Sequence, residues 1–398
     1  MPPAISYVLI SMNRSIPDSA YLDRLDNRIK TLVETPNSSI RGIIRECQGA
    51  FPTIVYDRLE QLNLLGELST GDTSSVNSSS HAAYPELHPL DFEWYFTDST
   101  TNAIAKTLRN QGEPVLCLGT PTVAFCLAKQ GISVVLVDRN SLIKERFDPE
   151  NENLTFLTED LNKSLEINEK FPVAFFDSPW YSEYTYTWLY RASEHIQRHG
   201  QMHFVLFPQL VRPSAIEQRK RLIHIAQQLG VVSIEEGSVT YKTPEFELEV
   251  LQNSEIPVIQ DWRRADLVNI EVNTPNALSP PPAEDINTTW DTFVISGQVV
   301  KVRKNISTEG TTALFPIEGS EGYVFTSVSR RDARRQSIDL WTSRNRVAAV
   351  GDRAIVVEAL QYLEDGMDLL DLYSTKFTNS DDDSRKREMV AEMTKILR

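Results

Sequence analysis

The sequence predicts an α/β protein in which residues 86–272 form a mainly parallel sheet covered by helices. Three observations support this prediction. Apolar, β-prone segments alternate with helical patterns through this part of the chain, and such alternation indicates βαβ units. Polar or proline-rich stretches flank it at 68–85 and 273–288, as expected of linkers. The chain of 398 residues also exceeds what one core usually supports, so two or three domains are expected.

Composition narrows the class of protein. The chain is 41% hydrophobic and 24% charged, which is typical of globular proteins. Its net charge of −15 disfavours non-specific binding of nucleic acid, because phosphates are repelled, although a local basic patch can override the overall charge. The same charge suits a cationic substrate or partner.

Cysteine usage and hydropathy indicate a cytoplasmic protein without a membrane segment. The three cysteines, Cys47, Cys117 and Cys126, have neither metal-ligand spacing nor the even number of a disulfide set. The first residues lack a basic leader, and no apolar run approaches the ~20 residues that span a bilayer. We therefore expect free thiols in a reducing compartment.

Residues 1–67 are predicted to form a helical domain resembling a winged helix. Apolar residues recur at helical spacing within 20–66, and a turn at Gly49–Pro52 precedes a third helix with the sequence TIVYDRLEQLNLLGEL. This candidate recognition helix carries Asp57 and Glu60 beside a single arginine. DNA-reading helices are usually richer in Lys and Arg, so we favour a protein contact or a packing role.

The central domain is expected to run from strand to helix repeatedly. The predicted helices are TVAFCLAKQG and the segments near 183–199 and 213–229. The predicted strands, in chain order, are EPVLCLG, SVVLVD, LTFLTEDL, PVAFFD, MHFVLFP, VVSIEEGSVTYK and FELEVLQ. The last two are adjacent in the chain, which suggests an antiparallel edge to the sheet.

Residues 289–398 are predicted to form a β-rich α+β domain. TFVISGQVVKVRK and GYVFTSVS are typical of strands, and 353–370 and 382–398 of helices. The most basic stretch, SRRDARR at 329–335, is either a solvated turn or helix face, or a contact for nucleic acid or an acidic partner.

Four predicted strands end in residues suited to ligand binding. In an open α/β sheet, ligands bind beyond the carboxyl ends of the strands. The first ends at Gly119, where backbone can approach a ligand, or where the chain simply turns into a helix. The second ends at Asp138, about twenty residues later, which suits a ribose diol. Asp160 follows the third and either meets a base or caps a helix. The fourth ends at Asp177 in the sequence Asp-Ser-Pro-Trp.

This order of motifs resembles an S-adenosylmethionine-dependent methyltransferase with a Rossmann-like class I sheet. Residues 177–180 resemble the Asp-Pro-Pro-(Tyr/Phe/Trp) signature of enzymes that methylate exocyclic or side-chain nitrogens. The upstream PLDFEWYFTDSTTNAIAKTL resembles the lead-in of the N6-adenine methyltransferase family, some members of which resemble protein-lysine methyltransferases. The order of helical unit and catalytic domain is also similar to that of branched-polyamine synthases. Two departures stand out: Ser178 replaces proline, and the glycine loop holds one glycine.

The resemblance implies roles for individual residues. Asp177 and the Ser178 carbonyl would accept the protons of an attacking amine, and Pro179 would hold the turn. Trp180 would stack on a base or contact an ammonium, with Tyr181 and Glu93 also facing the substrate. The residues implied in binding S-adenosylmethionine are Phe96, Thr97, Thr100, Gly119, Thr120, Asp138, Asp160 and Leu161. For the first three, an N-capped helix with a core aromatic is the alternative.

Three functions compete at this stage. The first is an N-methyltransferase acting on a protein lysine or on adenine N6, so that the acceptor partner is protein or nucleic acid. The second is an aminopropyltransferase of polyamine synthesis using decarboxylated cofactor, which needs further carboxylates; Glu93, Asp160 and Glu183 are candidates. The third is a non-catalytic sensor or scaffold. A partner protein could contact residues 20–66 or 289–398.

No metal site is expected. His195 and His199 are spaced i, i+4, but without a third ligand a solvent-facing helix is the better interpretation.

Overall fold

The computed structural model describes most of the chain. Residue Glu93, residues 1–18 and most of the predicted linker at 68–85 lie outside the described part. The described residues are 19–70, 86–90, 94–145, 151–163, 165–252, 256, 259–281, 290–306, 314–318, 320, 322–325, 332–368 and 383–397.

The central domain is built on a sheet in the order β3-β2-β1-β4-β5-β7-β6. The first five strands are parallel, and β7 runs antiparallel to both β5 and β6. The predicted mainly parallel α/β sheet is therefore confirmed, and its edge is antiparallel, although not between the two predicted strands. The strands are β1 Val115–Leu118, β2 Val134–Asp138, β3 Leu154–Thr158, β4 Phe171–Phe176, β5 Ile196–Leu206, β6 Gly230–Thr240 and β7 Arg264–Val272.

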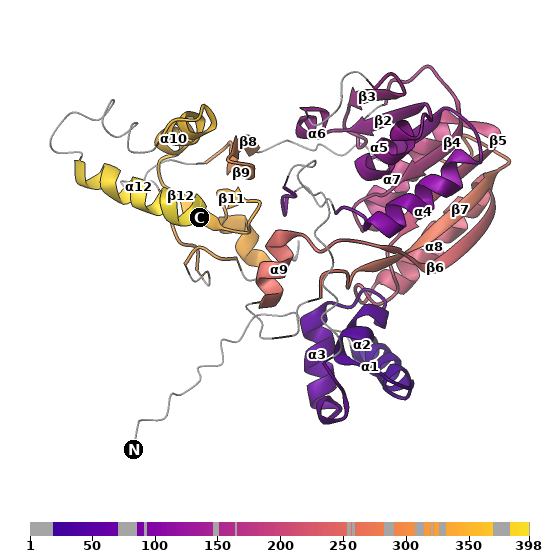
Figure 1. The fold of residues 1–398 in the computed structure, drawn as a ribbon, viewed down its shortest axis with the longest axis horizontal. Coiled ribbons are helices and arrows are strands. Elements are labelled where there is room, and N and C mark those ends of the chain that lie inside the picture. Colours follow the sequence, from indigo (N-terminus) through magenta and orange to yellow (C-terminus); the bar gives the residue numbers. More distant parts are fainter. Residues whose placement is uncertain are drawn as a thin grey trace.

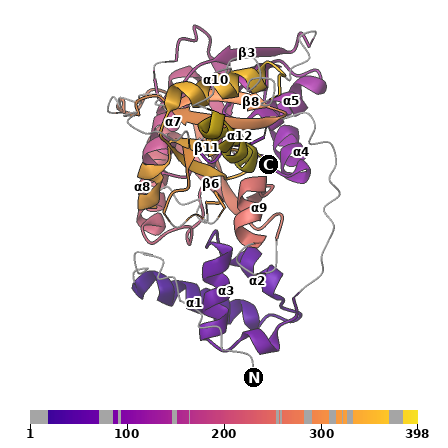
Figure 2. The ribbon, with the colours of Figure 1, turned by 90° about the vertical axis from the view of Figure 1, so that its left-hand side faces the viewer.

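Helices cover the two faces of this sheet as two pairs. Asp98–Arg109 (α4) packs against Pro121–Lys129 (α5), and Ser182–His195 (α7) packs against Ala215–Leu229 (α8). Figure 2 shows the pairs on opposite sides of the sheet. The buried strand β1 is therefore apolar at every position, as expected of a strand covered on both faces. The short helix α6, Ser141–Glu145, follows β2.

Two predicted elements of this domain were wrong in type or extent. FELEVLQ is helix α9, Glu245–Gln252: its alternating pattern suggests a strand, but Phe246, Val250 and Leu251 are buried together at helical spacing. The helix predicted to reach residue 199 ends at His195, and the chain enters β5 at once. The antiparallel partner is instead β7, which the sequence pattern did not reveal.

Three N-terminal helices pack onto the central domain. They are α1 Ser19–Val33, α2 Ile40–Glu46 and α3 Pro52–Gln61, at the bottom of Figures 1 and 2. Their apolar side chains share one core with Trp262 and Leu210 of the central domain, and Tyr21 donates a hydrogen bond of 2.9 Å to the Leu210 carbonyl. Within residues 19–70 no strand pair forms a wing; Ser69 makes a single bridge with Ser39. The winged-helix assignment stays an interpretation, with one face of the helices used for packing.

The C-terminal domain has a five-stranded sheet in the order β10-β12-β11-β9-β8. Within the described part, GYVFTSVS contributes one bridge, between Val324 and Arg346, in place of the predicted strand; residues 326–331 lie outside it. The elements are β8 Trp290–Ile295, β9 Gln298–Arg303, β10 Leu314–Phe315, β11 Leu340–Thr342, β12 Val347–Val350, α10 Arg353–Glu364 and α12 Asp383–Leu397. Helix α10 is shorter than the predicted 353–370, because a turn follows Glu364.

Two partly exposed arginines of the basic stretch lie against aromatic rings of this domain. The Arg334 guanidinium lies 4.9 Å from the Phe325 ring centre and that of Arg335 lies 4.4 Å from the ring centre of Trp341. Arg334 also pairs with Asp332. These contacts favour the local role over a groove for nucleic acid. In the described part of the chain, no helix combines the length and apolarity needed to cross a membrane.

Candidate functional site

A cavity lies at the carboxyl ends of the central strands. The register pairs Leu118 with both Val137 and Phe176, so that Gly119, Asp138 and Asp177 leave the sheet side by side. The described lining residues are Trp94, Tyr95, Gly119, Pro121, Asp138, Arg139, Glu159, Asp160, Leu161, Asn162, Asp177, Ser178, Pro179, Trp180, Tyr184, Trp188, Tyr241 and Arg263. The strand-end residues expected from the sequence are thus brought together.

Gly119 meets a tryptophan that the sequence did not single out. Its φ is +62°, a left-handed conformation that favours glycine, and an added Cβ would lie 2.5 Å from the Trp188 ring. The Trp188 side chain therefore packs directly on the turn between β1 and α5. Its indole Nε1 is buried without a hydrogen-bond partner among the described residues, so it is a donor available to a ligand in the cavity.

The ends of β2 and β3 supply the next group of lining residues. Asp138 is 5% exposed, and its Oδ1 accepts the Asn140 N–H at 2.8 Å. Asp160 Oδ1 accepts the backbone and side-chain N–H groups of Asn162, each at 3.0 Å. Asp160 therefore stabilises a turn, not a helix, and it also lines the cavity; its contact with a base stays a prediction. Leu161 is buried beside it.

Asp177 is hydrogen-bonded to a tyrosine that follows the edge strand β6. The Tyr241 hydroxyl donates a hydrogen bond of 2.8 Å to Asp177 Oδ2. Asp177 Oδ1 is buried without a partner among the described residues, while the residue lines the cavity. Burial raises the pKa of Asp177 to about 7, against the opposing effects of the Tyr241 hydrogen bond and the Arg263 charge. This carboxyl group can therefore change protonation state near neutral pH.

The rest of the Asp-Ser-Pro-Trp motif forms a fixed turn. The Ser178 hydroxyl lies 2.9 Å from that of Thr185, buried under α7. Serine at this position thus ties the motif to the helix, which proline cannot do. Tyr181 lies outside the lining, with the Arg212 guanidinium 5.3 Å from its ring centre, which gives it a packing role.

The positively charged side chain of Arg263 packs on the Trp180 ring. The Arg263 guanidinium carbon lies 3.7 Å from the Trp180 ring centre and 4.1 Å from that of Trp94. The Trp180 ring therefore already makes a cation–π contact within the chain, and the predicted contact with a substrate base or ammonium stays a prediction. The Glu247 carboxyl group, 2% exposed, is coupled electrostatically to the same guanidinium. Burial nevertheless raises the pKa of Glu247 to about 8.

The lead-in residues Phe96, Thr97 and Thr100 pack next to the site without lining the cavity. Phe96 packs against Phe175 and Tyr241, with ring centres 6.1 and 5.0 Å away. The Thr97 hydroxyl caps α4 by accepting the Thr100 N–H at 3.3 Å. Neither these three residues nor the buried Thr120 is among the lining residues. The structure thus shows the capped helix and core aromatic of the alternative interpretation, and direct cofactor contact by these residues stays a prediction.

Several lining residues escaped sequence reasoning. Trp94 sits in the lead-in motif, so its aromatic neighbours were a usable signal. Tyr241 and Arg263 carry no local signal, because they meet only where the ends of β6 and β7 come together: the Tyr241 N–H donates to the Arg263 carbonyl at 3.0 Å. Glu183 is exposed and outside the lining, whereas Glu159 lines the cavity.

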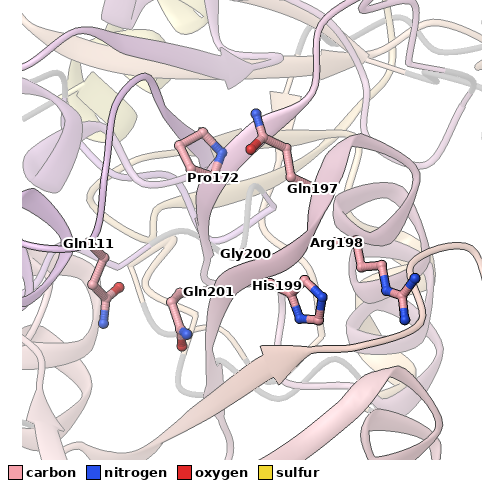
Figure 3. A pocket seen from close by; sticks show the side chains of 7 residues that line it. All are labelled: Gln111, Pro172, Gln197, Arg198, His199, Gly200 and Gln201. Atoms are coloured by element: carbon pink, nitrogen blue, oxygen red, sulfur yellow. The ribbon is translucent and has the colours of Figure 1, made fainter.

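A second hollow lies at the opposite, amino-terminal ends of the strands. Figure 3 shows its polar lining, which includes Gln111, Gln197 and His199. His199 has a φ of +65° and lies in β5, while His195 is buried at the end of α7. The two histidines are therefore not on one helix face. No metal-binding cluster of three or more His, Cys, Asp or Glu occurs among the described residues.

The cavity residues fit an S-adenosyl sulfonium compound. A carboxylate at the end of β2 suits a ribose diol, and the buried, unpartnered atoms Asp177 Oδ1 and Trp188 Nε1 offer an acceptor and a donor. The acidic side chains Asp138, Glu159, Asp160 and Asp177 outnumber the arginines in the lining, which suits a positively charged sulfonium.

Comparison with known proteins supports the fold. No protein-family model matches the sequence, and no curated protein matches it. The branched-chain polyamine synthase from Thermus thermophilus, solved with N4-aminopropylspermidine and 5′-methylthioadenosine, superposes with a TM-score of 0.52 at 15% identity, covering 66% of this chain and 90% of that one. Its C9 mutein, with the same ligands, gives a TM-score of 0.53 at the same identity and coverage. The chain thus shares the fold of these synthases over the matched part of its length.

An rRNA methylase from Streptococcus thermophilus overlaps more weakly. Its TM-score is 0.29 at 15% identity, over 44% of this chain and 95% of that one.

Proposed function

We propose that the protein transfers an alkyl group, most simply the methyl of S-adenosylmethionine, to an amine nitrogen. The proposal rests on the environment of the Asp177 carboxyl group, which belongs to a residue that lines the cavity. Its Oδ2 accepts a hydrogen bond from Tyr241, and its Oδ1 is buried without a partner among the described residues. A carboxylate that is fixed through one oxygen and has no partner at the other can accept a hydrogen bond from an attacking amine. That hydrogen bond would orient the lone pair of the amine.

The donor would lie along the ends of β1, β2 and β3. Asp138 would hold the ribose, Asp160 and Leu161 would meet the base, and Gly119 with Trp188 would border the sulfonium end. When bound, the donor supplies an electrophilic carbon whose bond to sulfur breaks as the bond to nitrogen forms. Asp177 would orient the amine and take the proton that the nitrogen loses, a role suited to its pKa of about 7.

A second candidate is an aminopropyltransferase using the decarboxylated donor. The fold similarity to a polyamine synthase extends over 66% of this chain, more than the central domain alone, and the cavity lining is acidic. A donor without its carboxylate carries a higher positive charge, which an acidic cavity favours. The nitrogen chemistry assigned to Asp177 is the same in both candidates.

Label transfer tests the proposal. The full chain is incubated with methyl-labelled S-adenosylmethionine and a cell extract, and protein, nucleic acid and small molecules are then separated; a parallel reaction uses decarboxylated donor. Label should enter one fraction with the native chain and not with Asp177→Ala. The matched control is Glu217→Ala, which removes an exposed carboxylate paired with Lys220 on α8. Donor binding without transfer from either donor would instead indicate the non-catalytic sensor or scaffold.

A further inference from the structure

The aromatic face of Trp180 is already in use. Trp180 is 7% exposed, Arg263 covers one face at 3.7 Å, and Tyr241 approaches at 5.6 Å with an interplanar angle of 76°. Enzymes that modify a nucleobase hold it by stacking against aromatic or apolar side chains. A base stacking here would have to displace the Arg263 guanidinium.

Arg263 is fixed between its neighbours. The guanidinium carbon also lies 4.1 Å from the Trp94 ring centre, so the arginine packs against two indole rings. In their ionised forms, Glu247 and Asp177 raise the pKa of Arg263, although burial lowers that pKa overall. Its backbone carbonyl accepts the Tyr241 N–H at 3.0 Å, which anchors the residue at the start of β7. The position of Arg263 against the two rings is therefore fixed by several contacts within the chain.

The charge around the site opposes a nucleic-acid acceptor as well. Four carboxylates and two arginines line the cavity in the described chain, so phosphates nearby are repelled. In the described part of the 329–335 stretch, Arg334 and Arg335 already pack on aromatic rings of the C-terminal domain, and Arg334 also pairs with Asp332.

The cavity residues that Arg263 does not cover suit a narrow, positively charged group. Asp177 Oδ1 is buried without a hydrogen-bond partner among the described residues, and Tyr184 and Trp188 belong to the lining. A methylene chain ending in an amine needs only a narrow passage, a carboxylate for the nitrogen and aromatic or apolar walls for the carbons.

We propose that the acceptor is an aliphatic amine and that Arg263 is the residue that sets this specificity, by denying the face of Trp180 to a nucleobase. The inference rests on the proposed function and narrows its acceptor. The amine belongs either to a free polyamine or to a lysine side chain; the chemistry recognised is the same, and the experiment separates the two sources.

The test measures binding and transfer separately. Acceptor binding is measured by calorimetry with the donor site saturated by S-adenosylhomocysteine, using spermidine, a lysine-containing peptide and 2′-deoxyadenosine as probes. The neutral nucleoside avoids phosphate repulsion. Transfer is then measured with labelled methyl and aminopropyl donors on the same probes and on an adenine-containing oligonucleotide. The native chain should bind and modify one of the two amines and should leave adenine unmodified.

Variants at Arg263 test whether this residue is what keeps a nucleobase from stacking on Trp180. Arg263→Ala should open Trp180 and tighten deoxyadenosine binding about 5- to 100-fold, as expected for one base stack. Arg263→Lys keeps a cation at the face and should keep the native preference. The control, Arg335→Met, removes a similar arginine–tryptophan contact far from the cavity and should change neither.

The outcomes separate the two proposals. Amine binding without transfer from either donor would leave the inference standing and refute the proposed function. Label on adenine, deoxyadenosine binding to the native chain as tight as amine binding, or no amine binding at all would overturn the inference. If Arg263→Ala does not fold, the native acceptor profile and Arg263→Lys still decide it.

Discussion

The Tyr241 hydroxyl lies 2.8 Å from Asp177 Oδ2 and donates a hydrogen bond to it. The two residues follow strands that are not neighbours in the sheet: Asp177 follows the central strand β4, and Tyr241 follows the edge strand β6. Phe96 packs on the Tyr241 ring at 5.0 Å, so the lead-in segment fixes the tyrosine. This contact leaves Oδ1 as the carboxyl oxygen of Asp177 without a partner among the described residues.

Tyr241→Phe should impair catalysis while leaving donor affinity unchanged. Because the hydrogen bond lowers the pKa of Asp177, its loss should raise that pKa and move the acid limb of the pH–rate profile to higher pH. A hydrogen bond to a charged group is worth ~1.5–3 kcal/mol, so kcat should fall about 10- to 100-fold near pH 7. The control is Tyr323→Phe, which removes the tyrosine–Glu392 hydrogen bond in the C-terminal domain. An unchanged acid limb would contradict the positioning role.

Asp177→Asn should stabilise the fold at alkaline pH while lowering kcat/KM at least about 100-fold. Burial raises the folded-state pKa from 3.8 to about 7, so between these values the folded state binds more protons than the unfolded state. Stability therefore falls as pH rises through this window, and the loss persists above it. The amide removes this effect: the variant should melt higher than the native chain at pH 8 and equally near pH 3. A thermal-melting series over pH checks this, with Glu217→Gln as control. A native-like melting curve at pH 8 would refute the stated pKa shift.

Gly119→Ala should weaken both folding and donor binding. The residue has a φ of +62°, and its new Cβ would lie 2.5 Å from the Trp188 ring, so strain and a clash should together lower the free energy of unfolding by ~1–3 kcal/mol. Adding Trp188→Leu should relieve the clash but not the strain, so that the two substitutions are non-additive. Chemical denaturation of the two single variants and the double variant measures the coupling. Gly131→Ala is the control, since its φ is +81° and nothing lies within 4 Å of an added Cβ. Additive losses would mean that Trp188 does not pack on this turn.

Asp138→Ala should weaken donor binding without affecting the acceptor. A carboxylate bound to a ribose diol makes charge-assisted hydrogen bonds, and its loss should weaken S-adenosylhomocysteine binding about 10-fold or more. Calorimetry with S-adenosylhomocysteine and with spermidine checks the two affinities independently. Asp138→Asn retains an acceptor and should recover part of the donor affinity. Equal losses for donor and acceptor would point to a general disturbance of the β2 end.

Much of the central domain was predictable because its signals are local. The apolar runs of β1, β2 and β4 predict covered parallel strands, and the residue that ends each strand must lie at the carboxyl edge of the sheet. Gly119, Asp138, Asp160 and Asp177 were therefore found from the sequence. Where apolar and charged residues alternate, as in Phe246–Val250, the pattern misled: tertiary packing chose a helix for residues that strand periodicity also fits.

By itself, then, the sequence determined the parallel α/β sheet and the row of strand-end residues that lies beside the Asp-Ser-Pro-Trp motif. Tertiary structure alone decided what surrounds that motif. Tyr241 and Arg263 reach Asp177 and Trp180 only because β6 and β7 fold back antiparallel at the sheet edge, and Trp188 covers Gly119 only because α7 packs against β4. Such contacts join residues far apart in the chain, and they depend on the packing of whole elements, which no local pattern of side chains encodes.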